Sequence, residues 1–230
     1  MFYDNTLGYV GNTPLLKSNS VLDVNFYVKY EGINPSGSVK DRAACYLLNK
    51  ILNNGEINRD TTIIESSSGN FGIALATYCK NIGMKCTIVI DPNILEINEF
   101  LITSLATKVV KVKDRDKTGG FLLTRVQYIK DVLEQNDNYY WANQYGNPYI
   151  AEAYQNTLGK EICDDVEVDY VFLGVSSGGT ITGVSKAVKE QYPNAKVIAV
   201  DTVGSVIFGN APKKRYIPGI GSSMLPKILD

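Results

Sequence analysis

The chain has 230 residues, of which 44% are hydrophobic, so it can bury the core of one large domain or two small ones. Its 23 basic and 24 acidic residues nearly balance, which argues against nucleic-acid binding, and no apolar run is long enough to cross a bilayer. The chain has no histidine, which excludes a Ser–His–Asp triad and a histidine-based metal site, and we expect no metal. Acid–base chemistry must therefore use lysine, tyrosine, a carboxylate, a thiol or a cofactor.

The four cysteines are expected to be reduced thiols of a cytoplasmic protein. Cys45, Cys79, Cys86 and Cys163 form no C-x-x-C pair, and each lies in an apolar or helical context. Disulfides are rare in the cytosol, so buried thiols are the simplest interpretation. The first residues show no signal-peptide pattern, which agrees with a cytoplasmic location and no membrane contact.

Short apolar runs rich in β-branched residues alternate with longer amphipathic runs. In chain order, we predict strands at residues 25–30, 62–65, 85–90, 108–112, 170–174 and 196–201. We predict helices at residues 38–53, 70–82, 94–105, 121–135, 150–162 and 180–191. Gly55 and Gly83 follow two of these helices, where a left-handed C-cap favours glycine. This order predicts an α/β fold with a mostly parallel sheet, apolar along its strands because helices cover both faces.

The first motif that could carry chemistry is the loop Asn-Pro-Ser-Gly-Ser-Val-Lys-Asp-Arg at residues 34–42. Ser38 is a good N-cap for the following helix, which places Lys40 in its first turn, at the positive end of the helix dipole. This position disfavours a charged amine and suits an uncharged, nucleophilic amine, as a Schiff base requires. Taken alone, the segment favours an ordinary surface lysine at a capped helix start.

The second motif is the serine-rich loop Glu-Ser-Ser-Ser-Gly-Asn-Phe-Gly at residues 65–72, which follows a predicted strand and opens a predicted helix. Backbone N–H groups and three hydroxyls at a helix N-terminus would bind a small anion, and a carboxylate is the natural one. The alternative is a serine cap with glycine for turn geometry.

The third motif is the loop Gly-Val-Ser-Ser-Gly-Gly-Thr-Ile-Thr-Gly at residues 174–183, which again connects a strand to a helix. Two adjacent glycines allow the backbone to approach a phosphate closely, and Thr180 adds a hydroxyl. The loop lacks the lysine of a nucleoside triphosphate loop and the G-x-G-x-x-G order of a dinucleotide loop. A glycine-rich turn without a ligand is the alternative.

Together and in this order, these segments resemble the fold-type II pyridoxal-phosphate enzymes of the cysteine synthase and cystathionine β-synthase family. The resemblance runs from Gly11-Asn12-Thr13-Pro14-Leu15 to Pro218-Gly219-Ile220-Gly221 and so covers nearly the whole chain. Within the family, the chain is most similar to the branch that makes a 2,3-diaminopropionate precursor for siderophores. The segments behind this finer likeness are residues 90–92, 119–125, 141–145 and 204–209.

The resemblance implies a role for each matching residue. Lys40 would hold pyridoxal 5'-phosphate covalently, and Asn70 would hydrogen-bond the ring hydroxyl of the cofactor. The phosphate loop would consist of Ser176, Ser177, Gly178, Gly179 and Thr180. The substrate pocket would consist of Ser67, Ser68, Asn70, Phe71 through its backbone N–H, Gln144, and Tyr145 at the mouth.

The chain departs from the cysteine synthase pattern at two positions and in length. Ser176 stands where cysteine synthases usually have glycine, and Phe71 where they usually have threonine. The family continues past residue 230, so we expect the C-terminal part of the large domain to be absent. Residues 1–35 with 146–230 would form this large domain, residues 36–145 a smaller one inserted in it, and the enzyme would be a homodimer.

The predicted reaction is a β-replacement on a serine that bears a good leaving group at Cβ. Lys40 would remove the α-proton, and the cofactor would take up the negative charge. The finer likeness implies O-phospho-L-serine and the amine of L-glutamate, with charge for the phosphate from Arg42, Arg125 or Arg215. The alternatives are a cysteine synthase using O-acetylserine and sulfide, a truncated homologue without catalysis, and an unrelated anion-binding α/β protein.

Overall fold

The structure is a computed structural model that describes residues 6–18, 26–117 and 119–229. The strands are β1 (Leu15–Ser18), β2 (Phe26–Lys29), β3 (Thr62–Ser66), β4 (Cys86–Ile90), β5 (Lys108–Lys111), β6 (Tyr139–Trp141), β7 (Tyr170–Gly174) and β8 (Lys196–Val200). The α-helices are α1 (Lys40–Asn53), α2 (Asn70–Asn81), α3 (Glu96–Leu105), α4 (Leu122–Gln135), α5 (Pro148–Tyr154), α6 (Lys160–Asp165) and α7 (Gly179–Gln191). Short 3-10 helices lie at Thr6–Tyr9 and Glu31–Ile33, and a π-helical turn at Gln155–Gly159.

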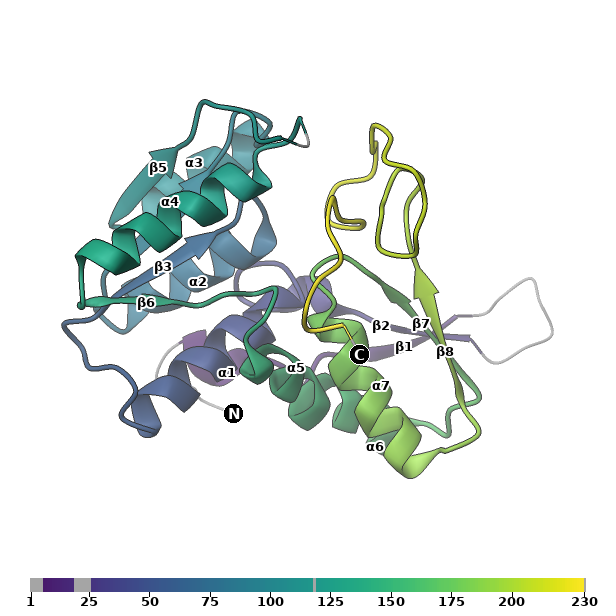
Figure 1. The fold of residues 1–230 in the computed structure, drawn as a ribbon. Coiled ribbons are helices and arrows are strands. Elements are labelled where there is room, and N and C mark those ends of the chain that lie inside the picture. Colours follow the sequence, from purple (N-terminus) through teal and green to yellow (C-terminus); the bar gives the residue numbers. More distant parts are fainter. Residues whose placement is uncertain (1–5, 19–25, 118, 230) are drawn as a thin grey trace.

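The predicted α/β fold with parallel strands is confirmed. A four-stranded sheet in the order β5-β4-β3-β6 is parallel throughout, and β7 pairs with β8 in parallel. Only the β1–β2 pair is antiparallel among the described strands. Figure 1 shows the four-stranded sheet on one side of the molecule and the β7–β8 pair on the other, with α1 and α5 between them. Both glycines expected as left-handed helix ends, Gly55 and Gly83, have positive φ angles of 70° and 73°.

The four-stranded sheet lies between helices, with α2 and α3 on one face and α4 on the other (Figure 1). Every residue of β3 and β4 is buried, as expected for strands covered on both faces. Because all four strands run in the same direction, their carboxyl ends meet at one edge of the sheet. The loops that follow β3, β4 and β6 therefore come together at this edge.

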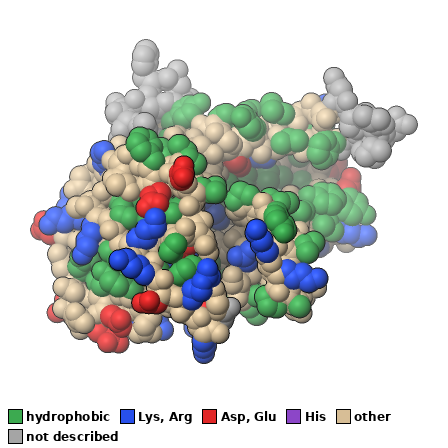
Figure 2. Space-filling model, turned by 90° about the horizontal axis from the view of Figure 1, so that it is seen from above, with side chains coloured by type: hydrophobic (Ala, Val, Ile, Leu, Met, Phe, Trp, Pro, Cys, Tyr) green, Lys and Arg blue, Asp and Glu red, His purple; other side chains and the backbone are tan. Residues whose placement is uncertain are grey.

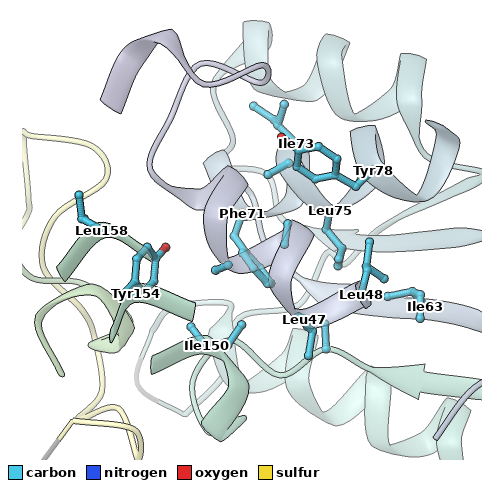
Figure 3. Close-up of a cluster of buried hydrophobic side chains, with 14 of the residues drawn as sticks. Leu47, Leu48, Ile63, Phe71, Ile73, Leu75, Tyr78, Ile150, Tyr154 and Leu158 are labelled. Carbon is cyan, nitrogen blue, oxygen red and sulfur yellow. The ribbon is translucent and has the colours of Figure 1, made fainter. Parts of the chain in front are cut away.

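The main hydrophobic core joins the helices to the sheet. Figure 3 shows Leu47 from α1, Phe71 and Leu75 from α2, and Ile150 and Tyr154 from α5 converging in this core. Each of these side chains is at most 2% exposed, so the start of α2 is held against α1 and α5 by close packing. A smaller cluster lies on the α4 side of the sheet and includes Ile64, Val89 and Ile129.

Of two expectations about the second half of the chain, the predicted helix is confirmed with a π-helical turn inside it, and the burial of the β7–β8 pair is wrong. The helix expected at residues 150–162 consists of α5, the π turn and α6 in succession. The β7–β8 pair has one exposed face, where Tyr170 and Phe172 are 54% and 63% exposed and their rings stack at 6.5 Å. The continuous apolar sequences of these two strands predicted that helices would cover both faces of the pair. Alternate residues of a strand point to opposite faces of its sheet. Within the described residues, α7 packs against β7 on one face, and the other face is exposed to solvent.

The helix α7 packs against α5 and the π turn at backbone distance. A Cβ at Gly183 would lie 2.2 Å from the Ala151 carbonyl oxygen, and a Cβ at Gly159 would lie 2.5 Å from the Ala187 Cβ. Glycine is therefore required at both contacts, and the start of α7 is fixed relative to α5. Among the described residues, no helix combines the length and the hydropathy that a bilayer span needs.

The surface seen from above in Figure 2 mixes both charges on the left and gathers hydrophobic side chains on the right. Residues after β8 contribute large exposed apolar side chains: Val203, Phe208, Tyr216 and Ile217 are each more than half exposed. On the face drawn in Figure 2, basic and acidic side chains of the described residues are interspersed, in agreement with the balanced net charge of −1.

Candidate active site

Lys40 is the first residue of α1, in the first turn as predicted, but Ser38 is not its N-cap. The cap position is Val39, and the Ser38 hydroxyl accepts only a long bond of 3.3 Å from the Lys40 N–H. The carboxylate of Asp41 instead folds back and accepts from the N–H groups of Ser36 at 2.8 Å and Ser38 at 3.3 Å. A buried carboxylate near the positive end of the helix is the stronger acceptor, so it takes the role expected of the serine.

The Lys40 amine is placed to be an uncharged nucleophile. Burial lowers its pKa to about 8, and Lys40 forms no ion pair within the described residues. Its Nζ lies 3.4 Å from the hydroxyl of Ser177, in the glycine loop 137 residues further along the chain. About half of the amine is therefore uncharged at pH 8, whereas an ordinary lysine is almost fully charged there.

The glycine loop between β7 and α7 has the form of an anion site. Gly178 has a φ of 88°, a conformation that favours glycine, and no side chain caps α7, which begins at Gly179. The first N–H groups of the helix are left without intrahelical acceptors. A Cβ at Gly179 would lie 2.5 Å from the Ile150 Cγ2, so a larger residue cannot occupy this turn.

The hydroxyls of this loop are already partly engaged. Ser176 Oγ donates to the Gly221 carbonyl at 3.1 Å and so ties the loop to the glycine segment 218–223. Thr180 shares a side-chain hydrogen bond with Tyr154, whose hydroxyl donates to the Val39 carbonyl at 3.2 Å. Ser176 must therefore release Gly221 before it can donate to a ligand, while Tyr154 connects the glycine loop to the residue before Lys40.

The serine-rich loop opens α2 without a side-chain cap at Gly69. Ser67 Oγ instead accepts from the N–H of Gly72 at 2.9 Å and of Gly69 at 3.4 Å. Asn70 is exposed at the start of the helix, and Phe71 is buried in the core with 2% exposure. The N–H groups of Asn70 and Phe71 have no intrahelical acceptor, so this turn can receive a small anion.

A charged cluster that the motifs alone do not assemble lies beside this loop. Arg125 from α4 donates to Ser68 Oγ at 2.8 Å and pairs with Asp91 at 3.3 Å. Ser68 in turn donates to Asp91 at 3.0 Å. Arg125 is 8% exposed, and its Nε is buried without a hydrogen-bond partner within the described residues. Arg125, whose Nε donor has no partner within the described residues, therefore bonds Ser68, which is next to the turn that can receive an anion at the start of α2.

Gln144 and Glu65 close the inner side of the same loop. The Gln144 backbone N–H donates to Glu65 at 3.3 Å, and its side-chain amide donates to the Ser66 carbonyl at 3.1 Å and to Glu65 at 3.5 Å. Burial raises the pKa of Glu65 to about 8. Sequence reasoning named Gln144 but missed Glu65, whose position at the end of an apolar strand was the available signal. Tyr145 is half-buried, burial raises its pKa, and its carbonyl accepts from Ile228 N–H at 3.1 Å.

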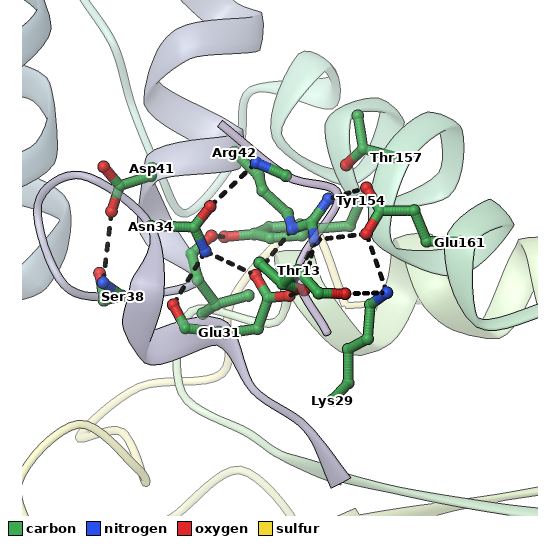
Figure 4. Close-up of polar contacts among 12 residues, drawn as sticks. Thr13, Lys29, Glu31, Asn34, Ser38, Asp41, Arg42, Tyr154, Thr157 and Glu161 are labelled. Carbon is green, nitrogen blue, oxygen red and sulfur yellow. Dashed lines mark hydrogen bonds and ion pairs between the residues drawn. The ribbon is translucent and has the colours of Figure 1, made fainter. Parts of the chain in front are cut away.

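Of the three arginines considered for substrate charge, Arg42 is excluded. Its guanidinium is fully buried and bonds Glu31 at 2.7 and 2.8 Å and Glu161 at 2.6 and 2.8 Å (Figure 4). These two carboxylates occupy its donors. Arg215 donates to Ser223 at 3.1 Å in an exposed setting. Arg125 alone among the three is held at the serine-rich loop.

Comparison with known proteins agrees with this site. The family description "Pyridoxal-phosphate dependent enzyme" matches residues 6–229. A hydrogen sulfide-producing enzyme from Fusobacterium nucleatum is 30% identical with a TM-score of 0.90, and the match covers 100% of this chain and 78% of that one. An O-acetylserine dependent cystathionine beta-synthase from Helicobacter pylori is 29% identical over 99% and 76% of the two chains, with a TM-score of 0.90.

An O-ureido-L-serine synthase, whose structure matches with a TM-score of 0.89, is 26% identical over 100% of this chain and 73% of its own. The family match spans all of the described residues, including the buried lysine and both anion-type loops. The chain therefore belongs to the family of pyridoxal-phosphate dependent enzymes.

Proposed function

We propose that the chain catalyses β-replacement on an activated L-serine, with pyridoxal phosphate bound by Lys40 and by residues 176–180. The observation that carries this proposal is a buried amine with a pKa of about 8, 3.4 Å from Ser177 in an uncapped glycine loop. The residues fit the cofactor, because the free N–H groups suit its phosphate and the uncharged amine suits its aldehyde.

When bound, pyridoxal phosphate supplies an electron sink for negative charge at the α-carbon of an amino acid. The proposed role of Lys40 Nζ is to take the α-proton, since its pKa near 8 matches a general base working close to neutral pH. Asn70, exposed at the start of α2, is proposed to bind the cofactor ring hydroxyl. The N–H groups of the α2 turn, with Ser67, Ser68 and Gln144, are proposed to orient the substrate by its α-carboxylate.

The finer proposal is that O-phospho-L-serine and L-glutamate are the substrates, as in the formation of a 2,3-diaminopropionate precursor for siderophores. Both bring an additional anionic group, and Arg125 has a buried Nε without a partner among the described residues. Arginine is suited to phosphate and carboxylate because its donors form a planar fork. Tyr145 follows Gln144 and is proposed to border the entrance for the second substrate.

A second candidate is a cysteine synthase, using O-acetylserine and sulfide. The names of two similar structures favour it, since one is O-acetylserine dependent and another produces hydrogen sulfide. Ser176 also supports the cysteine synthase candidate. Its hydroxyl already donates to the Gly221 carbonyl and so is not free to donate to a phosphate leaving group.

Steady-state rates with both substrate pairs distinguish the two candidates. We expect higher kcat/KM with O-phospho-L-serine and L-glutamate than with O-acetylserine and sulfide. Replacing Arg125 with Met should reduce the first rate about tenfold or more, because one donor to a charged group is worth ~1.5–3 kcal/mol. The second rate should change much less. Arg125→Lys, which keeps the charge next to Asp91 but loses the fork, should restore only part of the first rate.

The matched control is Arg59→Met, which removes an exposed arginine that donates a hydrogen bond to the Ile82 carbonyl. Its rates with both pairs should equal those of the wild type. Equal or faster turnover of O-acetylserine and sulfide by the wild type would place the chain with the cysteine synthases.

A further inference from the structure

The carboxyl group of Glu65 is buried directly behind the proposed carboxylate pocket and has no assigned role. Glu65 lies on β3 with 0% exposure, and its oxygens receive hydrogen bonds from Ser66 N–H at 2.9 Å and from the Gln144 N–H at 3.3 Å. The Gln144 side-chain amide, which also bonds the Ser66 carbonyl, lies 3.5 Å from Glu65 Oε1. Glu65 therefore contacts both Gln144 and the first residue of the loop.

We propose that Glu65 is a positioning residue that sets the Gln144 amide for the substrate carboxylate, and that ionisation of Glu65 weakens carboxylate binding. This inference rests on the proposed function, because it assumes that the loop of residues 66–71 and Gln144 receive the α-carboxylate. It adds a group that is not part of that pocket and that changes charge in the physiological pH range.

The neutral acid is the form that the surroundings favour. Glu65 has no cation within ion-pair distance in the described structure, since the neighbouring Arg125 pairs with Asp91. A buried carboxylate without a cation is costly, and two of the three hydrogen bonds to Glu65 are long. Burial therefore outweighs these bonds and raises the pKa of Glu65 to about 8.

Two consequences follow when Glu65 loses its proton. The negative charge attracts the Gln144 amide protons more strongly, which holds the amide toward Glu65 and away from a ligand. The charge also repels a carboxylate bound in the adjoining turn, and in a buried setting that repulsion is only weakly screened. Both effects reduce the affinity for a carboxylate as the pH rises through the pKa of Glu65.

The other ionisable groups that face Glu65 do not reproduce this change. Burial raises the pKa of Tyr145, and the hydrogen bond of the Cys86 thiol to Cys79 together with burial raises the pKa of Cys86 on β4, so both stay neutral near pH 8. Arg125 on α4 remains charged, and its partner Asp91 is a carboxylate held by Ser68. The pKa of Lys40, which burial lowers to about 8, is that of its free amine, and in the holoenzyme this amine would be bound to the cofactor.

The test measures the affinity of the holoenzyme for propionate, a carboxylate without an amine, by calorimetry between pH 6 and pH 9. In the wild type the affinity should be about fivefold lower at pH 9 than at pH 7, as one pKa unit of coupling implies. In Glu65→Gln, which is neutral at every pH and nearly the same size, the affinity at pH 7 should be retained and most of this decrease should be lost. Any pH dependence of the affinity that comes from Lys40 is the same in both proteins and cancels when they are compared. Glu134→Gln, which changes an exposed glutamate of α4, should behave like the wild type.

Each outcome has a definite meaning. An affinity that does not vary with pH in the wild type, or an equal decrease in wild type and Glu65→Gln, would overturn the role of Glu65. Absence of saturable propionate binding at every pH would overturn the proposed carboxylate pocket and this inference with it. If Glu65→Gln does not fold, infrared spectra of the wild type decide: a protonated carboxyl band at pH 7 that is lost by pH 9 is expected, and its absence at pH 7 would refute the proposal.

Discussion

Replacing Arg42 with Met should destabilise the fold more than any exposed charge change on the same helix. The guanidinium has 0% side-chain exposure and joins the N-terminal segment to α6 through Glu31 and Glu161, with Thr13 as a further partner at 3.1 Å (Figure 4). Lys29 lies 3.1 Å from Glu161 and extends the network. Methionine fills much of the same volume, so the change removes the charge and the hydrogen bonds rather than the packing.

The expected cost is set by the two carboxylates that remain. Removing one partner of a buried ion pair costs about 3–5 kcal/mol, because the other is left buried without compensation. Glu31 and Glu161 keep 15% and 18% side-chain exposure, and Lys29 still reaches Glu161, so we expect the lower end, about 3 kcal/mol. That is a large part of the 5–15 kcal/mol that stabilises a typical domain, as an order of magnitude.

Acid unfolding gives a second signature. Burial alone would raise the pKa of Glu161, but its hydrogen bonds with Arg42 and Asn12 lower it to about 2. A lowered carboxylate pKa contributes stability above the ordinary value of 4.5, and this contribution is lost as the pH falls toward 2. Without screening, this pKa shift of Glu161 would contribute ~3 kcal/mol to the free energy of unfolding. Because the group is partly exposed, solvent screening reduces the contribution to about 1–2 kcal/mol. In Arg42→Met this part of the acid dependence should disappear.

Urea unfolding followed by circular dichroism measures both effects, at pH 7 and across the acid range. Lys50→Met is the matched control, since Lys50 lies on the same helix and pairs with Glu152 at the surface, where such pairs contribute little. Its unfolding midpoint should stay close to that of the wild type. If Arg42→Met unfolds at the same urea concentration as Lys50→Met, the network does not stabilise the fold as argued.

Three further predictions follow from the site and its supports. Gly179→Asp should abolish binding of pyridoxal phosphate, measured by visible absorbance, because a Cβ would lie 2.5 Å from Ile150 and the charge would repel the phosphate; unchanged affinity would place the phosphate elsewhere. Labelling of Lys40 by pyridoxal phosphate with borohydride should accelerate about tenfold per pH unit up to pH 8 and then level off, since only the uncharged amine reacts; a rise that continues to pH 10 would contradict the lowered pKa. Gly183→Ala should lower the urea midpoint, because its Cβ would lie 2.2 Å from the Ala151 carbonyl oxygen and α7 would have to move; an unchanged midpoint would show that these helices can separate freely.

The regular elements could be predicted where local pattern and tertiary environment agree. Within the described residues, which exclude residue 25, the six predicted strands match the observed bounds within one residue at either end, and α1, α2, α3, α4 and α7 begin within two residues of the prediction. The strand β6 was missed because it has three residues and depends on pairing with Thr62–Ile64, about 77 positions earlier in the chain. The strand β1 was missed for the same reason, since its pairing with β2 gives it its extended form.

The loops of the site could be predicted from the sequence, but the charged residues that contact them could not. The glycine loop and the serine-rich loop each combine a strand, a glycine turn and a helix start, which are local signals. Glu65 and Asp91 were not predicted, because their roles depend on Gln144 and Arg125, which lie tens of residues away. Asp41 was missed although its partners Ser36 and Ser38 are local, because Ser38 is itself a common N-cap residue. Equally, sequence alone could not separate the fully paired Arg42 from Arg125. The domain boundaries, the homodimer and the cytoplasmic location stay predictions.

The proposed function requires that Lys40 is the residue that holds the cofactor. The most direct measurement is borohydride reduction of the protein with bound pyridoxal phosphate, followed by proteolysis and mass spectrometry of the peptides. We expect the mass of the reduced cofactor on the peptide that contains Lys40, and we expect Lys40→Ala to remove the label without labelling a second lysine. Label found mainly on another lysine, or an equal amount of label in Lys40→Ala, would contradict it.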